Sequence, residues 1–219
     1  GSSSAYGGGV YSSSSSPALI NCIISANKIA AGSSAYGGGI YCSSSALLLT
    51  SGTITRNSAG SGGGVYCTGS SSTPQFTNSI LWGDTPSEIY LASSTPVVTY
   101  CDVQGGYTGT GNINVDPSFA FSDDFHLMPG SPCIDAGTDT PPGGLPAHDL
   151  EGDARLLDGN GDGQAKADMG VYEFNPAAPA LAFSPASIVI YVPEGQVGQE
   201  PKTLSIRNAS SGTMSWTLN

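Results

Sequence analysis

The residues Ser4-Ala5-Tyr6-Gly7-Gly8-Gly9-Val10-Tyr11 return as Ser34-Ala35-Tyr36-Gly37-Gly38-Gly39-Ile40-Tyr41, and a shortened copy follows at Gly62-Gly63-Gly64-Val65-Tyr66. Each glycine block leads into a Ser-rich stretch and then into an apolar one. Self-similarity with a period of roughly 20 to 50 residues is typical of solenoids and other repeat proteins. This repeat is the strongest sequence indication of the fold.

Two apolar positions, five residues apart, recur in four successive copies. An unbroken strand would place them on opposite faces, so we expect a corner between them. Asparagine suits such a corner because it tolerates a left-handed backbone. The two series are Leu19, Leu49, Phe76 and Val98, and Ile24, Ile54, Leu81 and Val103, with expected corners near Asn21, Ser51, Asn78 and Tyr100.

The composition favours a β-solenoid over a helical repeat. Glycine and proline supply 31 and 15 of the 219 residues, and glycine triplets and serine runs disfavour helices. Short runs of Val, Ile, Leu and Thr between Gly, Asn and Ser are typical of strands and turns. We therefore expect stacked coils about 4.8 Å apart, with like residues on like residues.

The charge balance excludes some partners. The formal net charge is −11, and a strongly acidic surface repels the phosphate backbone of nucleic acids. The longest apolar runs, such as residues 188–192, have five residues, whereas a membrane-spanning helix needs about 20. The sequence predicts neither nucleic-acid binding nor a membrane span.

The five cysteines leave the redox state open. Cys42 and Cys67 each follow a glycine block, so we expect them to stack in adjacent coils. The spacing suits either a disulfide or two buried, unpaired thiols. Cys22 and Cys101 share another repeat position but lie too many coils apart to bond, and Cys133 stands in a later segment. The spacings match no zinc site.

Two parts of the sequence resemble known families. The coil pattern, best developed in Asn21-Cys22-Ile23-Ile24-Ser25-Ala26-Asn27, resembles right-handed parallel β-helix proteins of the pectin-lyase-like superfamily. Residues 125–127, 131–137, 149–155 and 168–173 resemble the region that closes the helix in bacterial surface proteins with a choice-of-anchor Q domain. Ala154 departs from that pattern, which usually has proline there. The resemblance implies a secreted or surface-displayed bacterial protein.

The sequence thus predicts an all-β chain with four parts. Right-handed parallel β-helix coils occupy residues 1–116, and an acidic, loop-rich cap that closes the helix occupies 117–175. A Pro/Ala linker over 176–180 precedes a β segment over 181–219 that resembles a truncated immunoglobulin-like domain, and it is too short for a complete sandwich of roughly 100 residues. We expect the chain to be a piece of a larger protein.

A loop in the expected cap has the spacing of a calcium site. Asp158, Asn160 and Asp162 stand at positions 1, 3 and 5, glycine stands at position 6, and Gln164 stands at position 7. Asp168 stands one position before the place where an EF-hand has its bidentate Glu. The sequence predicts a Ca²⁺ site outside an EF-hand; the alternative is a solvated acidic turn.

Other polar residues of the expected cap have simpler interpretations. We expect His126, between two apolar residues, to be a satisfied structural residue and not a general base. Arg155, among several acids, is predicted to form a structural ion pair, and Asp135 to cap backbone amides in a turn. Asp123 and Asp124 are adjacent and point to opposite faces of a strand, so they do not form a glycosidase acid pair.

The most favoured function is glycan or surface-partner binding by a non-enzymatic display segment. Its candidate contacts are tyrosines, because aromatic faces stack on sugars; equally, these tyrosines form a stack that only stabilises the solenoid. They are Tyr6, Tyr11, Tyr36, Tyr41 and Tyr66. One alternative is a fragment of a polysaccharide lyase or glycoside hydrolase, in which Lys28 and Arg56 would neighbour each other in adjacent coils. Another is a structural spacer.

Overall fold

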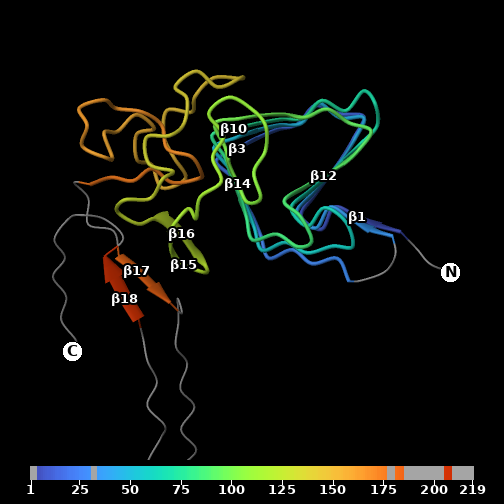
Figure 1. The fold of residues 1–219 in the computed structure, drawn as a ribbon, viewed down its shortest axis with the longest axis horizontal. Helices are drawn as coiled ribbons and strands as arrows, with labels where there is room; N and C mark the ends of the chain where they lie inside the picture. The colour runs from blue at the N-terminus through green and yellow to red at the C-terminus, as the bar shows by residue number, and fades with distance from the viewer. Residues whose placement is uncertain (1–3, 31–33, 177–180, 185–204, 209–219) are drawn as a thin grey trace, which may run out of the picture.

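The computed structural model describes residues 4–30, 34–176, 181–184 and 205–208 (Figure 1). Every regular element in these residues is a β-strand of two to four residues, which confirms the expected all-β class. The strands are short because glycine, serine and asparagine corners interrupt the chain. No helix in the described residues is long and apolar enough to cross a membrane.

Three parallel four-stranded sheets form the walls of a β-solenoid, as the repeat predicts. Each sheet takes one strand from each of four successive coils, and a two-stranded sheet of β1 (Ala5–Tyr6) and β5 (Ala35–Tyr36) adds to the first two coils. The first sheet contains β2 (Val10–Ser13), β6 (Ile40–Ser43), β9 (Val65–Thr68) and β12 (Ile89–Ala92); the second contains β3 (Ala18–Ile20), β7 (Leu48–Thr50), β10 (Gln75–Thr77) and β13 (Val97–Thr99); the third contains β4 (Ile23–Ser25), β8 (Thr53–Thr55), β11 (Ile80–Trp82) and β14 (Asp102–Val103).

The predicted corners are confirmed. The backbone takes a left-handed conformation between the second and third strands of every coil, with φ of 50° at Asn21, 52° at Ser51, 51° at Asn78 and 51° at Tyr100. This single residue per coil turns the chain, so two apolar positions five residues apart both point into the solenoid. The corners stack because the strands on either side pair in register.

The apolar core runs through the interior of the coils. Leu49 pairs with Leu19 and Phe76, and Ile54 pairs with Ile24 and Leu81, as the sequence predicts. Full burial of each such side chain stabilises the fold by roughly 1.5–3 kcal/mol. The residues of this core that are fully excluded from solvent are Ile40, Cys42, Leu47, Leu49, Ile54, Val65, Cys67, Phe76, Leu81 and Cys101.

Cysteine pairing is also decided by the structure. Cys42 and Cys67 lie beside each other in adjacent coils, as expected, and both are buried. All five cysteines carry free thiols. Of the two alternatives left open by the sequence, the structure shows the unpaired one.

A polar ladder crosses the apolar interior at another corner. Asn27 donates from its backbone N–H and from Nδ2 to Oδ1 of Asn57, at 3.0 and 2.9 Å. In the same way Asn57 donates to Oδ1 of Asp84, at 2.5 and 2.9 Å, and it also donates to the carbonyl of Ile24. One side chain per coil therefore satisfies buried polar groups of the coil next to it.

The polar ladder explains the glycine blocks. A Cβ atom at Gly39 would lie 3.1 Å from Nδ2 of Asn57, and one at Gly64 would lie 2.5 Å from Oδ2 of Asp84. The third glycine of each block therefore leaves the space that the ladder side chain fills. Close approach, and not backbone conformation, requires glycine at these two positions.

Residues 117–176, here called the loop segment, pack along the side of the coils (Figure 1). The segment contains the antiparallel pair β15 (Phe119–Phe121) and β16 (Asp124–Leu127). Asn21 of the first coil donates to the carbonyl of His148, and the thiol of Cys133 donates to Asp102 of the fourth coil. The segment expected to close the helix thus contacts the coils along the length of the stack.

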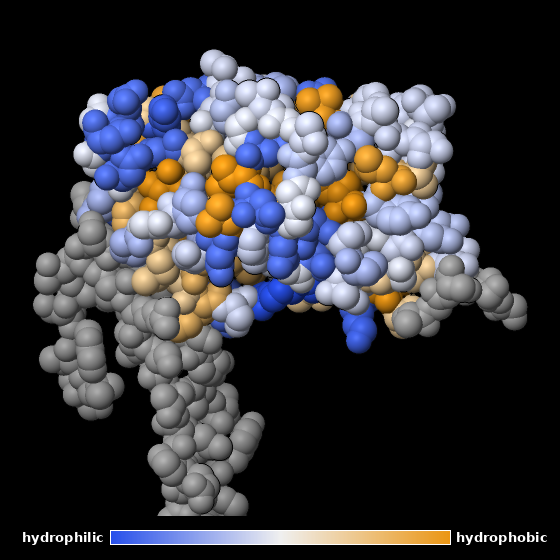
Figure 2. All heavy atoms as spheres, viewed as in Figure 1, coloured by the Kyte–Doolittle hydropathy of each residue, from blue (hydrophilic) through white to orange (hydrophobic). Residues whose placement is uncertain are grey.

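The loop segment and the coils share a second apolar core. Ile80, at the start of β11, is fully buried in it with Cys133 and Met169, and Leu127 and Phe174 are nearly so. In Figure 2 hydrophilic residues gather over the loops of this segment, at the upper left, while apolar residues form several separate groups. The coils thus contribute side chains to two apolar cores, one inside the solenoid and one shared with the loop segment.

Only a small part of the expected immunoglobulin-like segment is described. β17 (Leu181–Ser184) and β18 (Ser205–Asn208) form an antiparallel pair. Most of the segment expected over 181–219 and most of the expected linker lie outside the described residues. A partial β-sandwich at this end stays a prediction.

Candidate functional site

A pocket of about 380 Å³ opens where the turns that follow β8 and β11 meet the β15–β16 pair. Its lining includes three aromatic residues, Trp82, Phe119 and Phe125, together with Arg56 and Asp116. Ligand pockets in proteins commonly combine apolar, aromatic walls with a few polar groups of this kind. The sequence did not predict this site.

The local backbone directs Arg56 into this pocket. Arg56 follows β8 at a left-handed corner with φ of 57°, which holds its exposed side chain at the outer edge of the coil. Its Cζ atom lies 5.3 Å from the centre of the Phe125 ring, within cation–π range. Phe125 in turn packs edge-to-face on Phe119 at 5.4 Å. The guanidinium is therefore held against an aromatic wall.

Lys28 does not share this position. It aligns with Ser58 of the next coil, while Arg56 stands two residues before Ser58. The two bases are therefore out of register by two residues, because equivalent positions follow the strand pairing. The expectation that they neighbour each other needs this correction.

The predicted tyrosines form a continuous stack on the first sheet. Tyr11, Tyr41, Tyr66 and Tyr90 pair in register through the four coils. Their ring centres are 5.4, 5.5 and 5.2 Å apart, with interplanar angles of 5°, 8° and 10°. Tyr90 extends the series that the sequence had identified. No glycine block precedes it, but its apolar-Tyr-apolar setting matches that of Tyr66.

A second, shorter stack lies beside the first. Tyr6 and Tyr36 stack at 5.7 Å, and each also contacts the first stack, Tyr6 at Tyr41 and Tyr36 at Tyr66. Within the first stack, the rings of Tyr41 and Tyr66 already have neighbouring rings on both faces. Sugars stack on free aromatic faces, which Tyr41 and Tyr66 do not offer. Ligand binding by these tyrosines stays a prediction.

In the acidic loop, residues 158–164, backbone N–H groups donate hydrogen bonds to the side-chain oxygens of the same loop. Asp158 accepts from the N–H groups of Asp162 and Gly163 at 3.0 and 2.9 Å, and Asn160 accepts from Asp162 at 2.8 Å. The side chain of Asp162 accepts from the N–H of Gln164 at 2.8 Å. Four of the five predicted calcium ligands thus share one exposed loop, and calcium binding by it stays a prediction.

Asp168, the fifth predicted ligand, points away from that loop. Its exposed fraction is 1%, and its two oxygens accept from the N–H groups of Asp135 and Phe174 at 2.7 and 2.6 Å. Burial raises the pKa of Asp168 to about 7. Asp168 therefore organises the interior of the loop segment. In the described residues no three His, Cys, Asp or Glu side chains converge as a metal site.

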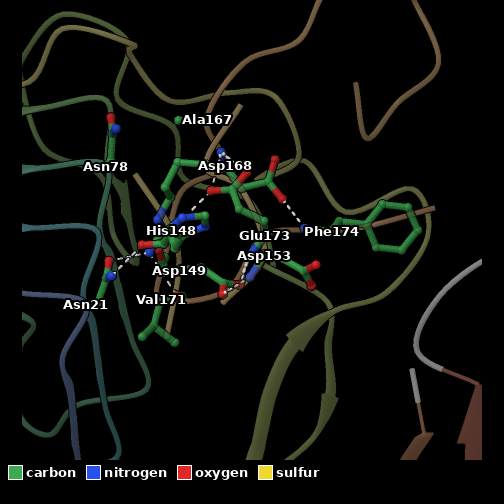
Figure 3. A network of polar contacts seen from close by, with 12 residues as sticks. Asn21, Asn78, His148, Asp149, Asp153, Ala167, Asp168, Val171, Glu173 and Phe174 are labelled. Atoms are coloured by element: carbon green, nitrogen blue, oxygen red, sulfur yellow. Dashed lines mark hydrogen bonds and ion pairs between the residues drawn. The ribbon is translucent and has the colours of Figure 1, made fainter. Parts of the chain in front are cut away.

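Arg155 is the centre of a buried network that joins the loop segment to the coils. Figure 3 shows other members of this network, among them Asn21 and Glu173. It is fully buried, and its Nη1 lies 2.7 Å from Oε1 of Glu173, so the predicted structural ion pair is present. Its Nη2 donates to Oδ1 of Asn21 in the first coil at 2.6 Å. Burial raises the pKa of Glu173, and so does the charge of Asp168, whereas Arg155 opposes both.

Asp149 completes this network through backbone groups. Its Oδ1 accepts from the N–H groups of Glu151, Gly152 and Asp153, and its Oδ2 accepts from the N–H of Glu173 at 2.9 Å. Asp135 likewise caps a backbone amide, that of Asn160, at 2.7 Å, as predicted. The acids of this segment mainly hold turns together.

His126 also has partners on both ring nitrogens. Nδ1 lies 2.5 Å from Asp124, Nε2 lies 3.2 Å from Glu151, and the ring stacks on Tyr172 at 4.1 Å. Burial lowers the pKa of His126, but the two carboxylates outweigh it and the net pKa is raised. The expected satisfied structural histidine is confirmed.

Comparisons with known proteins identify no relative: no family model, curated protein or solved structure matches the chain. Functional inference therefore depends on the geometry of this chain's own residues.

Proposed function

We propose that this chain is a segment of a secreted or cell-surface bacterial protein that binds glycans and has no catalytic activity of its own. The observation that carries the proposal is the pocket at Arg56, which Trp82, Phe119 and Asp116 also line and where the guanidinium lies over the ring of Phe125. Aromatic rings stack on the apolar faces of sugars, and charged groups bind their hydroxyls or carboxylates.

The cellular location rests on the resemblance to pectin-lyase-like β-helix proteins and to choice-of-anchor Q domains. The parallel coils support the first part of it. Residues that carry the second part, Asp149, Arg155, Asp168 and Glu173, belong to one buried network, which is a physical reason for a family to retain them. The free thiols are compatible with an extracellular location as well as with an intracellular one.

The test is retention of the purified chain on a panel of acidic and neutral polysaccharides, with and without calcium. Arg56→Ala should abolish retention, and Trp82→Ala should weaken it strongly, provided circular dichroism shows that both variants are folded. Lys28→Ala is the matched control, because Lys28 is an exposed base on the neighbouring coil and does not line the pocket. It should bind like the unmodified chain.

Each other outcome favours a different function. Newly formed sugar ends would indicate the enzyme alternative. No retention on any polysaccharide would favour the structural spacer. Retention that survives Arg56→Ala but is lost in Tyr11→Ala would move the site to the tyrosine stack.

A further inference from the structure

The polar ladder ends at a hollow in the fourth coil. Asn27, Asn57 and Asp84 each stand three residues after a member of the same apolar series, and Gly106 stands three residues after its fourth member, Val103. Gly106 has no side chain to continue the ladder. The place of the next polar side chain is therefore left open beneath Asp84.

Glu88 enters this place from a different position. Ile89 pairs with Val65, so Glu88 stands where the preceding coils have the third glycine of their block, here Gly64. It is 5% exposed, and its Oε1 accepts from the backbone N–H of Asp84 at 3.0 Å. The two carboxyl groups also lie within hydrogen-bonding reach of each other. Two acids thus meet where the ladder ends.

The turn that carries these acids has buried oxygens without partners. Oδ2 of Asp84, Oγ of Ser87 and Oε2 of Glu88 are buried and accept or donate no hydrogen bond. Among the described residues, few buried side-chain atoms lack a partner, and three of them lie within the turn formed by residues 84–88. Such atoms need an explanation, and a water or ion that the groups are arranged to meet is one.

The same three residues line a pocket of about 470 Å³, together with Gln104 and Tyr107 of the loop that leaves the fourth coil. In the part of the chain that the structure describes, neither Asp84 nor Glu88 forms an ion pair. Two buried carboxylates without a positive partner are costly. A cation in the pocket would remove that cost.

We propose that Asp84, Ser87 and Glu88 bind a calcium ion at the end of the polar ladder. Hard oxygen donors, two of them carboxylates, are the ligands that Ca²⁺ prefers, and its six to eight positions tolerate irregular geometry and water from the pocket. Mg²⁺ demands a near-ideal octahedron, whereas Ca²⁺ tolerates the irregular geometry of side chains from one short turn. This site is separate from the acidic loop at Asp158.

A proton shared by the two carboxyls is the competing explanation. Burial raises the pKa of Glu88 to about 9 and also raises that of Asp84, so one proton would satisfy both unpartnered oxygens. The proton leaves Oγ of Ser87 without a partner, whereas a cation would bind all three oxygens. Calcium binding by the full chain separates the two explanations.

The experiment uses the Asp158→Ala/Asp162→Ala variant as its background, so that the acidic loop contributes nothing. After chelation, calorimetry should show one Ca²⁺ bound per chain, and Tb³⁺ should give sensitised luminescence through Tyr107. Adding Glu88→Gln should weaken calcium binding by about tenfold or more, because the charge of the ligands sets affinity. Gln keeps the shape and can still donate to Asp84, and circular dichroism checks the fold.

A second variant covers the case in which Glu88→Gln does not fold. Ser87→Ala keeps both carboxyls and removes one proposed ligand, so it should weaken calcium binding while the melting temperature without calcium stays unchanged. The proposal is overturned if the background variant binds no calcium, or if neither substitution changes its affinity.

Discussion

The coils and the loop segment bury polar groups in opposite ways. In the coils, Asn27, Asn57 and Asp84 repeat one hydrogen-bonding arrangement from coil to coil. In the loop segment, the single guanidinium of Arg155 holds Glu173, two backbone carbonyls and Asn21 together. A repeated arrangement spreads its contribution to stability over several equivalent residues, whereas a central ion pair concentrates that contribution in one residue.

Each region contains a pair of neighbouring buried acids, and the two pairs differ in their access to positive charge. Glu173 and Asp168 lie near Arg155, so the loop segment carries its own positive charge. Asp84 and Glu88 have no ion-pair partner among the described residues. Burial of acids in the loop segment is thus a matter of folding, while at the end of the ladder it points to binding.

Loss of Arg155 should give the largest effect. Arg155→Met leaves Glu173 buried and unpaired, so the free energy of unfolding should fall by about 3–5 kcal/mol. Urea denaturation followed by circular dichroism measures this change. The double variant Arg155→Met/Glu173→Gln should recover part of the loss, because no unpaired charge remains. A single variant as stable as the unmodified chain would contradict the central role of this ion pair.

A methyl group within the glycine block should be the next most damaging change. A Cβ at Gly63 would collide with the backbone of Thr85 at the other end of the same coil, so Gly63→Ala should cost about 3 kcal/mol. Gly144→Ala is the control: nothing lies within 4 Å of its Cβ, and only its left-handed backbone costs about 1–2 kcal/mol. Equal losses in thermal melts would show that the close approach of Gly63 and Thr85 adds no cost of its own.

Removal of one rung of the polar ladder should cost less. Asn57→Ala leaves the N–H of Asn27 and the carbonyl of Ile24 without their partner, so we expect a loss of about 1–3 kcal/mol. The part-exposed Asn27 can exchange its bonds for water, so Asn27→Ala should cost less than Asn57→Ala. The reverse order in urea denaturation would mean that the ladder does not act through buried hydrogen bonds.

The smallest effect should be a pH dependence at His126, which faces Asp124, Glu151 and the ring of Tyr172. Because its pKa is raised in the folded protein, its contribution is fully present below about pH 6.5, the value of a free histidine, and is lost as pH rises through the folded pKa. The melting-temperature difference between the unmodified chain and His126→Gln should therefore shrink as pH rises. A constant difference would show that the proton on His126 does not contribute to stability.

The sequence alone determined the coils, because their information is local and repeated. Residues such as Leu49 and Ile54 recur in register, and the odd spacing between them required the corner that Ser51 provides. The tyrosine stack and the adjacent thiols of Cys42 and Cys67 followed from the same repeat. Because the strands pair parallel and in register, residues at equivalent positions of successive repeats become neighbours in space.

Only the tertiary structure decided the contacts between residues that no repeat relates. Arg155 meets Glu173 and Asn21, Asp168 turns away from the acidic loop, and Arg56 joins Phe125 across a long stretch of sequence. Glu88 reaches the polar ladder because it replaces a glycine, which its sequence neighbours do not reveal. Such contacts depend on how an irregular chain packs on the coils, and both proposed binding sites are formed in this way.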